Sequence, residues 1–496
     1  MNDDVDEFEE VACKCKLEDR KPTVDDFKGT KLWNVARCLL ESLCAGKKLL
    51  FLINPPYGTA CNGESSRGAS KAGIATQTKM QRIMQRDNIG APSQQLYAQF
   101  LYRIHLLSIL FPRAISLGIF APPLYMCSKI FKTLYETCLK GRFRDGFLLQ
   151  ASQFADVQGK WGISFCFWQD VLVTPDIATN DTPIHTLNVY EVTGNGVIPV
   201  KDCPRKSISF ANGNIAAFTK EIKVPETPTY TSFTMSSALK LSDGTCTLHE
   251  GNLGVLVSNA TIVEKNDQSV CIISSKMKGH FATYEIFPQN FNRICVNFTA
   301  RRLITGPYAT WVNCKDEYMI PNIEHPDYKR FEADSIIYSL FNTASNQSSL
   351  RDIEYNSKKW NIKNEFFWLS SDTMLALARA ASPMNKDVEQ DVNLFTGERY
   401  VYTLLQQAEV QANLSDTAKA VLAAATKLVI DSFKYRQDFA FIHPEYHINT
   451  WDAGWYQIKG ILKEYMPDEL KQFSELYKQF GDELRPLVYE LGFLYK

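Results

Sequence analysis

The feature that most constrains this chain is a short apolar run, Leu49–Ile53, that leads directly into Asn54-Pro55-Pro56-Tyr57. A continuous run of Leu, Phe and Ile is typical of a strand buried in a parallel sheet. Ligands of open α/β sheets bind beyond the carboxyl ends of such strands. The sequence therefore predicts a strand that delivers polar and aromatic groups to a binding edge. A strand that merely ends in an Asn-Pro turn is the alternative interpretation.

The segments around this run alternate between strand and helix. Helical patterns lie at 93–111 and 128–139, and apolar runs predict strands at 115–121, 143–149 and 161–168. This order predicts a doubly wound α/β domain over residues 1–170.

The rest of the chain has a different residue pattern. From 171 to 327, short Val-, Thr- and Ile-rich runs are separated by turn signals such as Gly194-Asn195-Gly196, which predicts a mostly β domain. Residues 328–496 turn helical again. We thus expect three regions, with boundaries near 170 and 327.

Charge is distributed unevenly along the chain. The formal net charge of −1 excludes a uniformly basic nucleic-acid coat. Residues 61–150, however, hold twelve basic residues against four acidic ones. Either a solvated helix face or a surface that contacts phosphates would explain this excess.

Other sequence features bear on location and cofactors. The most apolar stretch, 106–125, is broken by three prolines and an arginine, which argues against a membrane span. The 13 cysteines form no CxxC pair and indicate free thiols in a reducing cytoplasm. Of the histidines, His443 and His447 alone stand four apart, and Pro444 between them argues against a zinc-binding helix face, so we expect no metal.

The Asn-Pro-Pro-Tyr motif offers the groups that an exocyclic amino group requires. Asn54 has a side-chain amide oxygen, and Tyr57 has an aromatic face. Pro55 has a backbone carbonyl oxygen but, as a proline, no backbone N–H. Two acceptors can hold the amino hydrogens while a stacked ring clamps the base. The nitrogen lone pair is then directed at an electrophile.

The motif resembles the (Asp/Asn/Ser)-Pro-Pro-(Tyr/Phe/Trp) signature of adenine-N6 DNA methyltransferases of the large bacterial restriction-modification type. Residues 47–170 carry the resemblance, because LYAQFLYR at 96–103, LGIFAP at 117–122 and FADVQG at 154–159 are similar to the family's later motifs in order and spacing. SNQSSLR at 345–351 and WDAGWYQ at 451–457 are a weaker match to the C-terminal half of such enzymes.

The resemblance implies roles for particular residues. Asn54 and Pro55 would accept hydrogen bonds from the adenine amino group, Pro56 would stiffen the motif, and Tyr57 and Phe154 would stack on the two faces of the flipped base. The methyl group would come from S-adenosyl-L-methionine. The partner would be double-stranded DNA, and the basic residues that we select as candidate phosphate contacts are Lys71, Lys79 and Arg82.

The chain departs from the family before the motif. Only 53 residues precede Asn54, and they hold two glycines, Gly29 and Gly46, in no Gly-x-Gly pattern. We therefore expect a partial Rossmann-like methyltransferase sheet with the later strands only, and we identify no cofactor-binding residue. Leu49–Ile53 would then be an exposed apolar edge strand. Either a second polypeptide supplies the missing half or the reading frame begins inside a longer gene, and the chain alone is expected not to bind S-adenosylmethionine.

Two classes of function remain open at this point. The first is a site-specific DNA adenine-N6 methyltransferase that is incomplete on its own. The alternative is a non-catalytic DNA-recognition or interaction subunit of a restriction-modification system. A weaker third possibility applies the same motif to an RNA base or a protein glutamine.

Overall fold

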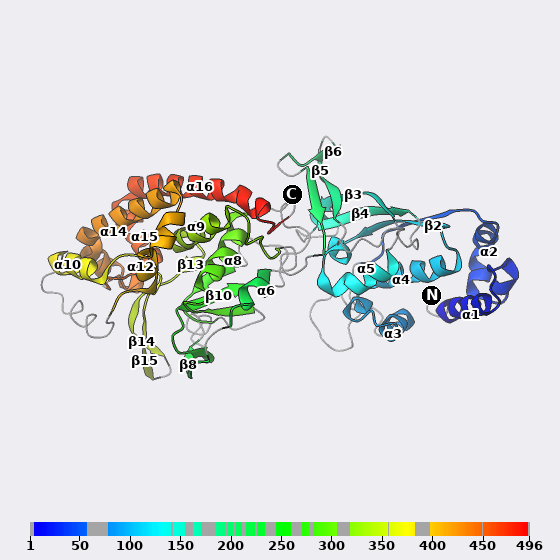
Figure 1. Ribbon diagram of the computed structural model, residues 1–496, viewed down its shortest axis with the longest axis horizontal. Helices are drawn as coiled ribbons and strands as arrows, with labels where there is room; N and C mark the ends of the chain where they lie inside the picture. Colours follow the sequence, from blue (N-terminus) through cyan, green and yellow to red (C-terminus); the bar gives the residue numbers. More distant parts are fainter. Residues whose placement is uncertain are drawn as a thin grey trace. The chain divides into compact units, whose positions relative to one another are not determined.

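The computed structural model of the chain describes residues 4–56, 78–139, 142–153, 162–169, 184–194, 196–201, 204–210, 215–223, 226–233, 245–258, 270–276, 282–304, 318–355, 357–381, 397–448 and 450–494 (Figure 1). The chain divides into two compact units, each of which is described by itself. Unit 1 comprises residues 1–212 with 307–317 and 495–496, and unit 2 comprises 213–306 and 318–494.

Unit 1 is built on one mixed sheet. Its strands lie in the order β1 (Leu49–Ile53), β2 (Ile115–Ala121), β4 (Gly162–Gln169), β3 (Arg142–Gln150), β5 (His185–Thr193) and β6 (Gly196–Pro199), and β7 (Arg205–Ile208) also pairs with β5. β1 runs parallel to β2, whereas β4 is antiparallel to both β2 and β3. The strands and the α/β class predicted from the sequence are thus present.

Helices cover one face of this sheet. They are α3 (Lys79–Arg86), α4 (Leu96–Leu110) and α5 (Lys132–Cys138), which lie together on one side in Figure 1. Helices α1 (Asp4–Leu17) and α2 (Lys31–Cys44) precede β1, and α1 packs against α4. Leu117 and Ile119 of β2 and Leu101 of α4 are at most 1 % exposed and belong to one core. Alternate residues of each strand therefore supply the helix-covered face.

The sheet continues past residue 170, where the sequence suggested a boundary. β5 runs parallel to β3, and β5 and β6 form a hairpin whose turn ends at Gly196 with φ of 115°. Glycine reaches that backbone conformation without the clash that a Cβ would bring. Residues 185–208 therefore belong to the first unit rather than to a separate β domain.

Unit 2 combines a small sheet with many helices. The sheet has the order β12 (Ala282–Ile286), β10 (Gly254–Ser258), β11 (Val270–Ile273) and β13 (Ser345–Asn346), and two hairpins are formed by β8 (Thr229–Phe233) with β9 (Thr245–His249) and by β14 (Leu350–Tyr355) with β15 (Lys358–Ile362). The helices are α6 (Ile215–Lys220), α8 (Phe291–Leu303), α9 (Tyr328–Phe341), α10 (Ser371–Ala381), α12 (Tyr400–Leu405), α13 (Ala408–Asn413), α14 (Asp416–Ile442), α15 (Trp455–Tyr465) and α16 (Pro467–Glu490).

Helix α8 lies in the region that the sequence analysis assigned to strands. Its residues are buried on nearly every side, and it packs against α9. A helix that is buried all round lacks the one-sided apolar periodicity by which helices are recognised in sequences. That absence explains why the sequence pattern did not reveal it.

Among the described residues, no helix is both long and apolar enough to cross a membrane.

Candidate functional site

Asn54 lies one residue beyond the carboxyl end of β1, at the edge where the parallel strand β2 also ends. The register pairs Ile53 with Ile119, and β2 ends two residues later at Ala121, which is followed by Pro122. Asn54 is exposed, Pro55 is buried and Pro56 is exposed. The motif is thus anchored through Pro55 while its amide side chain remains accessible.

Two further segments reach the same edge of the sheet. Ser164 at the start of β4 donates a hydrogen bond from its hydroxyl to the carbonyl oxygen of Ala121 over 2.8 Å, and Ser164 is fully buried. β3 ends at Gln150, which pairs with Gly162, and continues into the short helical turn Ala151–Gln153. The carboxyl end of β3 therefore lies at the edge that carries Asn54.

Several predicted site residues lie outside the described residues. These are Tyr57, Lys71 and Phe154. Gln153, which directly precedes Phe154, is the last described residue of the turn after β3.

Lys79 and Arg82 lie on helix α3. Thr78 caps this helix by accepting a hydrogen bond from Gln81 N, and its hydroxyl donates to Gln99 of α4 over 2.7 Å. Arg82 is exposed, whereas Lys79 is half-buried. The cap and the hydrogen bond to α4 fix α3 in place, so that Arg82 projects from a rigid support.

β1 is the end strand of the sheet, and one of its faces is apolar and exposed. Leu50 is 49 % exposed and Leu52 is 68 % exposed, and no described strand pairs with the far side of β1. The prediction of an exposed apolar edge strand is therefore confirmed for the described part of the chain. Such an edge presents unpaired backbone groups and apolar side chains together.

Aromatic rings extend this apolar surface across the sheet. The ring centroids of Phe120 and Phe165 are 4.8 Å apart, and those of Phe147 and Phe165 are 5.4 Å apart. A Cβ on Gly118 would stand 2.6 Å from Leu52 and 2.8 Å from Phe165, so glycine lets both side chains lie across β2. Leu50, Leu52, Phe120, Phe147 and Phe165 form what we call the outer sheet face.

The described residues before β1 do not fit an S-adenosylmethionine site. They form α1, a short helical turn and α2, and no described strand precedes β1. Gly29 and Gly46 both have positive φ, but each belongs to a turn next to helix α2. The strand and glycine-rich turn that the resemblance requires are therefore not found in the described part of this segment.

A buried histidine begins strand β5 in the sheet of unit 1. His185 of β5 is hydrogen-bonded through Nε2 to the hydroxyl of Tyr135 over 2.7 Å and is 6 % exposed. Burial lowers the pKa of His185 to about 4, so the ring is neutral near pH 7. It belongs to the core and not to the Asn54 edge.

The segments 345–351 and 451–457 contact each other in unit 2. The side chain of Gln457 accepts a hydrogen bond from Ser349 N and donates one to Ser349 O, over 3.3 and 3.1 Å. Arg351 lies 3.4 Å from Asp452, which is fully buried. Trp451 and Trp455 are buried in the core, whereas Tyr456 is 51 % exposed.

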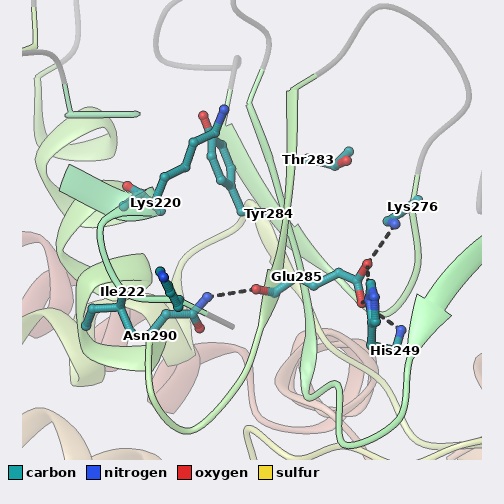
Figure 2. A pocket seen from close by; sticks show the side chains of 10 residues that line it. Lys220, Ile222, His249, Lys276, Thr283, Tyr284, Glu285 and Asn290 are labelled. Atoms are coloured by element: carbon teal, nitrogen blue, oxygen red, sulfur yellow. Dashed lines mark hydrogen bonds and ion pairs between the residues drawn. The ribbon is translucent and has the colours of Figure 1, made fainter. Parts of the chain in front are cut away.

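Unit 2 contains a pocket that no sequence motif marks (Figure 2). A cavity of about 290 Å³ lies between the end of α6, strand β12 and the residues His249 and Lys276. Three lysines, Lys220, Lys223 and Lys276, line it together with Tyr284 and Glu285. These residues are far apart in the sequence and form no motif, so no local pattern signalled the pocket.

Comparison with known proteins adds no assignment, since no family model matches the chain and no curated protein matches it. Among the described residues, no three His, Cys, Asp or Glu side chains are grouped so that they could hold a metal ion.

Proposed function

We propose that this chain carries the catalytic motif of a DNA adenine-N6 methyltransferase and needs a further polypeptide segment for the cofactor. The observation that carries the proposal is the position of Asn54-Pro55-Pro56 directly at the carboxyl end of a strand that is parallel to its neighbour. Open α/β sheets bind their ligands at this edge.

The strand order supports the same class. After the parallel pair β1 and β2, the antiparallel strand β4 is inserted before β3, which runs in the direction of β2. This mixed sheet belongs to the α/β class that the resemblance implies. Function depends on the site and not on the fold, and the site here is built around Asn54.

The chemistry assigned to the motif is positioning. The side-chain oxygen of Asn54 and the carbonyl oxygen of Pro55 accept hydrogen bonds from the amino group of a flipped adenine, which orients the nitrogen lone pair. Tyr57 and Phe154 are proposed to stack on the base, and the turn before Phe154 lies at the Asn54 edge. Positioning of this kind supplies much of the rate of a group transfer.

DNA is the proposed substrate. Exposed Arg82 and half-buried Lys79 on α3, with Lys71, are the candidate phosphate contacts within the basic stretch 61–150. The free thiols of the described cysteines support a reducing compartment, and thus the cytoplasm, as the place of action.

A second polypeptide is proposed to supply the S-adenosylmethionine-binding half. An added strand would pair with the open edge of β1, and its helices would cover Leu50 and Leu52, which are 49 % and 68 % exposed. This arrangement would complete the sheet on the side where the described residues leave it open.

Methyl transfer to duplex DNA tests the proposal. The chain is mixed with the product of the gene directly upstream, and incorporation of labelled methyl groups is measured. Asn54→Ala should abolish transfer, whereas Asn54→Asp, which keeps a side-chain acceptor that the family signature allows, should retain part of it. Full activity in Asn54→Ala would reject the assignment of the site.

The alternative is a DNA-recognition subunit without catalysis. The helices that stand before β1 in place of a cofactor site favour it. It predicts sequence-specific DNA binding that Asn54→Ala leaves unchanged and no methyl transfer in any mixture.

A further inference from the structure

The pocket of unit 2 gathers positive charge from two separate segments. Lys220 ends helix α6, Lys223 follows three residues later, and Lys276 follows strand β11. Glu285 is the one acidic residue among those that line the cavity, so the lysines outnumber the carboxylates.

Glu285 is already engaged by its neighbours. It is 2.7 Å from Lys276 Nζ and accepts a hydrogen bond from His249 N over 2.9 Å. Burial raises the pKa of Glu285, whereas the hydrogen bonds from Lys276 and His249 lower it. The effect of the hydrogen bonds is the larger, so the pKa of Glu285 lies below its ordinary value. Lys276 also donates to Thr247 O over 2.6 Å. Lys276 and Glu285 therefore neutralise each other.

Lys220 and Lys223 remain as the available cations. Neither forms an ion pair with any residue in the part of the chain that the structure describes, and both are exposed. Glu221, which lies next to Lys220 in the sequence, is held by an ion pair with Arg293. The local carboxylates thus leave the two ammonium groups unneutralised.

Tyr284 gives the pocket a polar and aromatic wall. Lys220 Nζ is 5.7 Å from the centroid of the Tyr284 ring, and Figure 2 shows the lysine side chain running alongside the ring. Burial raises the pKa of Tyr284, so its hydroxyl keeps its proton and can donate a hydrogen bond. Asn290, in contrast, uses its amide to bind Phe287 N and Glu285 O.

We propose that this pocket binds a phosphate group of the nucleic-acid backbone, with Lys220 and Lys223 as charged contacts and the Tyr284 hydroxyl as a hydrogen-bond donor. The inference rests on the proposed function, because DNA is the polyanion assigned there. Exposed lysines at the mouth of a pocket suit a phosphate on a long polymer, since its binding also releases condensed counterions.

The test compares the salt dependence of DNA binding by the full-length chain. Fluorescence anisotropy with a labelled duplex is recorded over a range of salt concentrations for wild type and for Lys220→Ala/Lys223→Ala. We expect the affinity to fall roughly tenfold for every duplex sequence, and the slope of log K against log salt to lose about 1 to 2 units. Lys220→Arg/Lys223→Arg should restore most of the affinity.

The matched control removes two other exposed lysines of unit 2, in Lys419→Ala/Lys471→Ala. This variant has the same net charge as the pocket variant, and its slope should stay within about 0.5 units of wild type. An equal loss of slope in the control would overturn the pocket as a specific contact.

The remaining outcomes separate the proposals. If wild type binds the duplex and the pocket variant binds it with the same slope, this inference fails and the proposed function stands. If wild type binds no duplex, this inference fails, and the methyl-transfer assay in the mixture decides the proposed function separately. If inorganic phosphate raises the melting temperature of wild type but not of the pocket variant while the DNA slopes coincide, the ligand is a free anion and the assignment to a nucleic-acid backbone is overturned.

Discussion

Arg399 donates a hydrogen bond from Nε to Asp452 Oδ2 over 2.7 Å, and neither side chain is exposed to solvent. The guanidinium of Arg399 also lies 4.4 Å from the ring centroid of Trp451, and Arg351 approaches the second oxygen of Asp452 at 3.4 Å. Asp452 thereby joins the segment 451–457 to the segment 345–351. A buried carboxylate between two arginines is tolerated only while its partners remain.

Asp452→Asn should destabilise unit 2 by about 3 to 5 kcal/mol, because it leaves the buried guanidinium of Arg399 without a counter-charge. Urea unfolding followed by circular dichroism measures the change. The control is Glu41→Gln in the exposed pair Arg37–Glu41, which should change stability by less than about 0.5 kcal/mol. Equal effects of the two substitutions would show that Asp452 does not hold the segments together.

Gly454→Ala tests the same contact from the backbone. A Cβ at Gly454 would lie 1.8 Å from the carbonyl oxygen of Gln347, which cannot move without displacing the segment 345–351. We expect a loss of more than about 3 kcal/mol in the free energy of unfolding. Gly481→Ala in helix α16, where the nearest atom is 3.4 Å away, should instead be neutral or stabilise by up to about 1 kcal/mol. A harmless Gly454→Ala would contradict the close approach of the two segments.

Local patterns in the sequence foretold much of unit 1. Leu49–Ile53 and Ile115–Ala121 became strands with those bounds, because buried parallel strands are marked by short apolar runs that end in proline or polar turns. The position of Asn54 followed from the same local signal. The turn signal at 194–196 likewise falls where β5 and β6 form a hairpin, in which Thr193 pairs with Gly196.

Local sequence patterns did not predict the features that depend on pairing between distant segments. Nothing local in His185–Thr193 shows that this strand joins β3, since the pairing links residues about forty positions apart. The pocket of unit 2 joins Lys220 to Tyr284 across an even larger separation. Sequence periodicity describes one element at a time, and such sites arise only when elements pack.

The stability of unit 1 should depend on pH through His185. Its pKa is about 4 in the folded chain, compared with an ordinary value near 6.5 for an unfolded histidine. Between about pH 4 and pH 6.5 the histidine of the unfolded chain binds a proton that the buried ring does not bind. The free energy of unfolding is therefore greatest above about pH 6.5 and falls by about 3 kcal/mol as the pH decreases to 4.

Urea unfolding of wild type and His185→Gln at several pH values measures this loss of stability. Glutamine keeps a hydrogen-bonding partner for Tyr135 but does not titrate, so the variant should lose less stability between pH 6.5 and 4.5 than wild type does. Other acidic and basic groups contribute equally to both proteins and cancel in the difference. Parallel pH profiles would contradict a buried neutral His185.

The exposed edge of β1 predicts self-association of the isolated chain. Leu50 and Leu52 are 49 % and 68 % exposed on a strand whose far side pairs with no described strand, and such edges promote pairing between molecules. Leu50→Lys/Leu52→Lys should lower the weight-average mass in sedimentation experiments, because lysine on an edge strand blocks pairing between molecules. The same variant should no longer capture the proposed cofactor-binding partner, because lysine at these positions cannot be buried against an added helix. Phe441→Lys, which replaces an apolar side chain of α14 that is 89 % exposed, is the matched control and should change neither property. If the double lysine variant still binds the partner as wild type does, β1 is not the edge at which the sheet is completed.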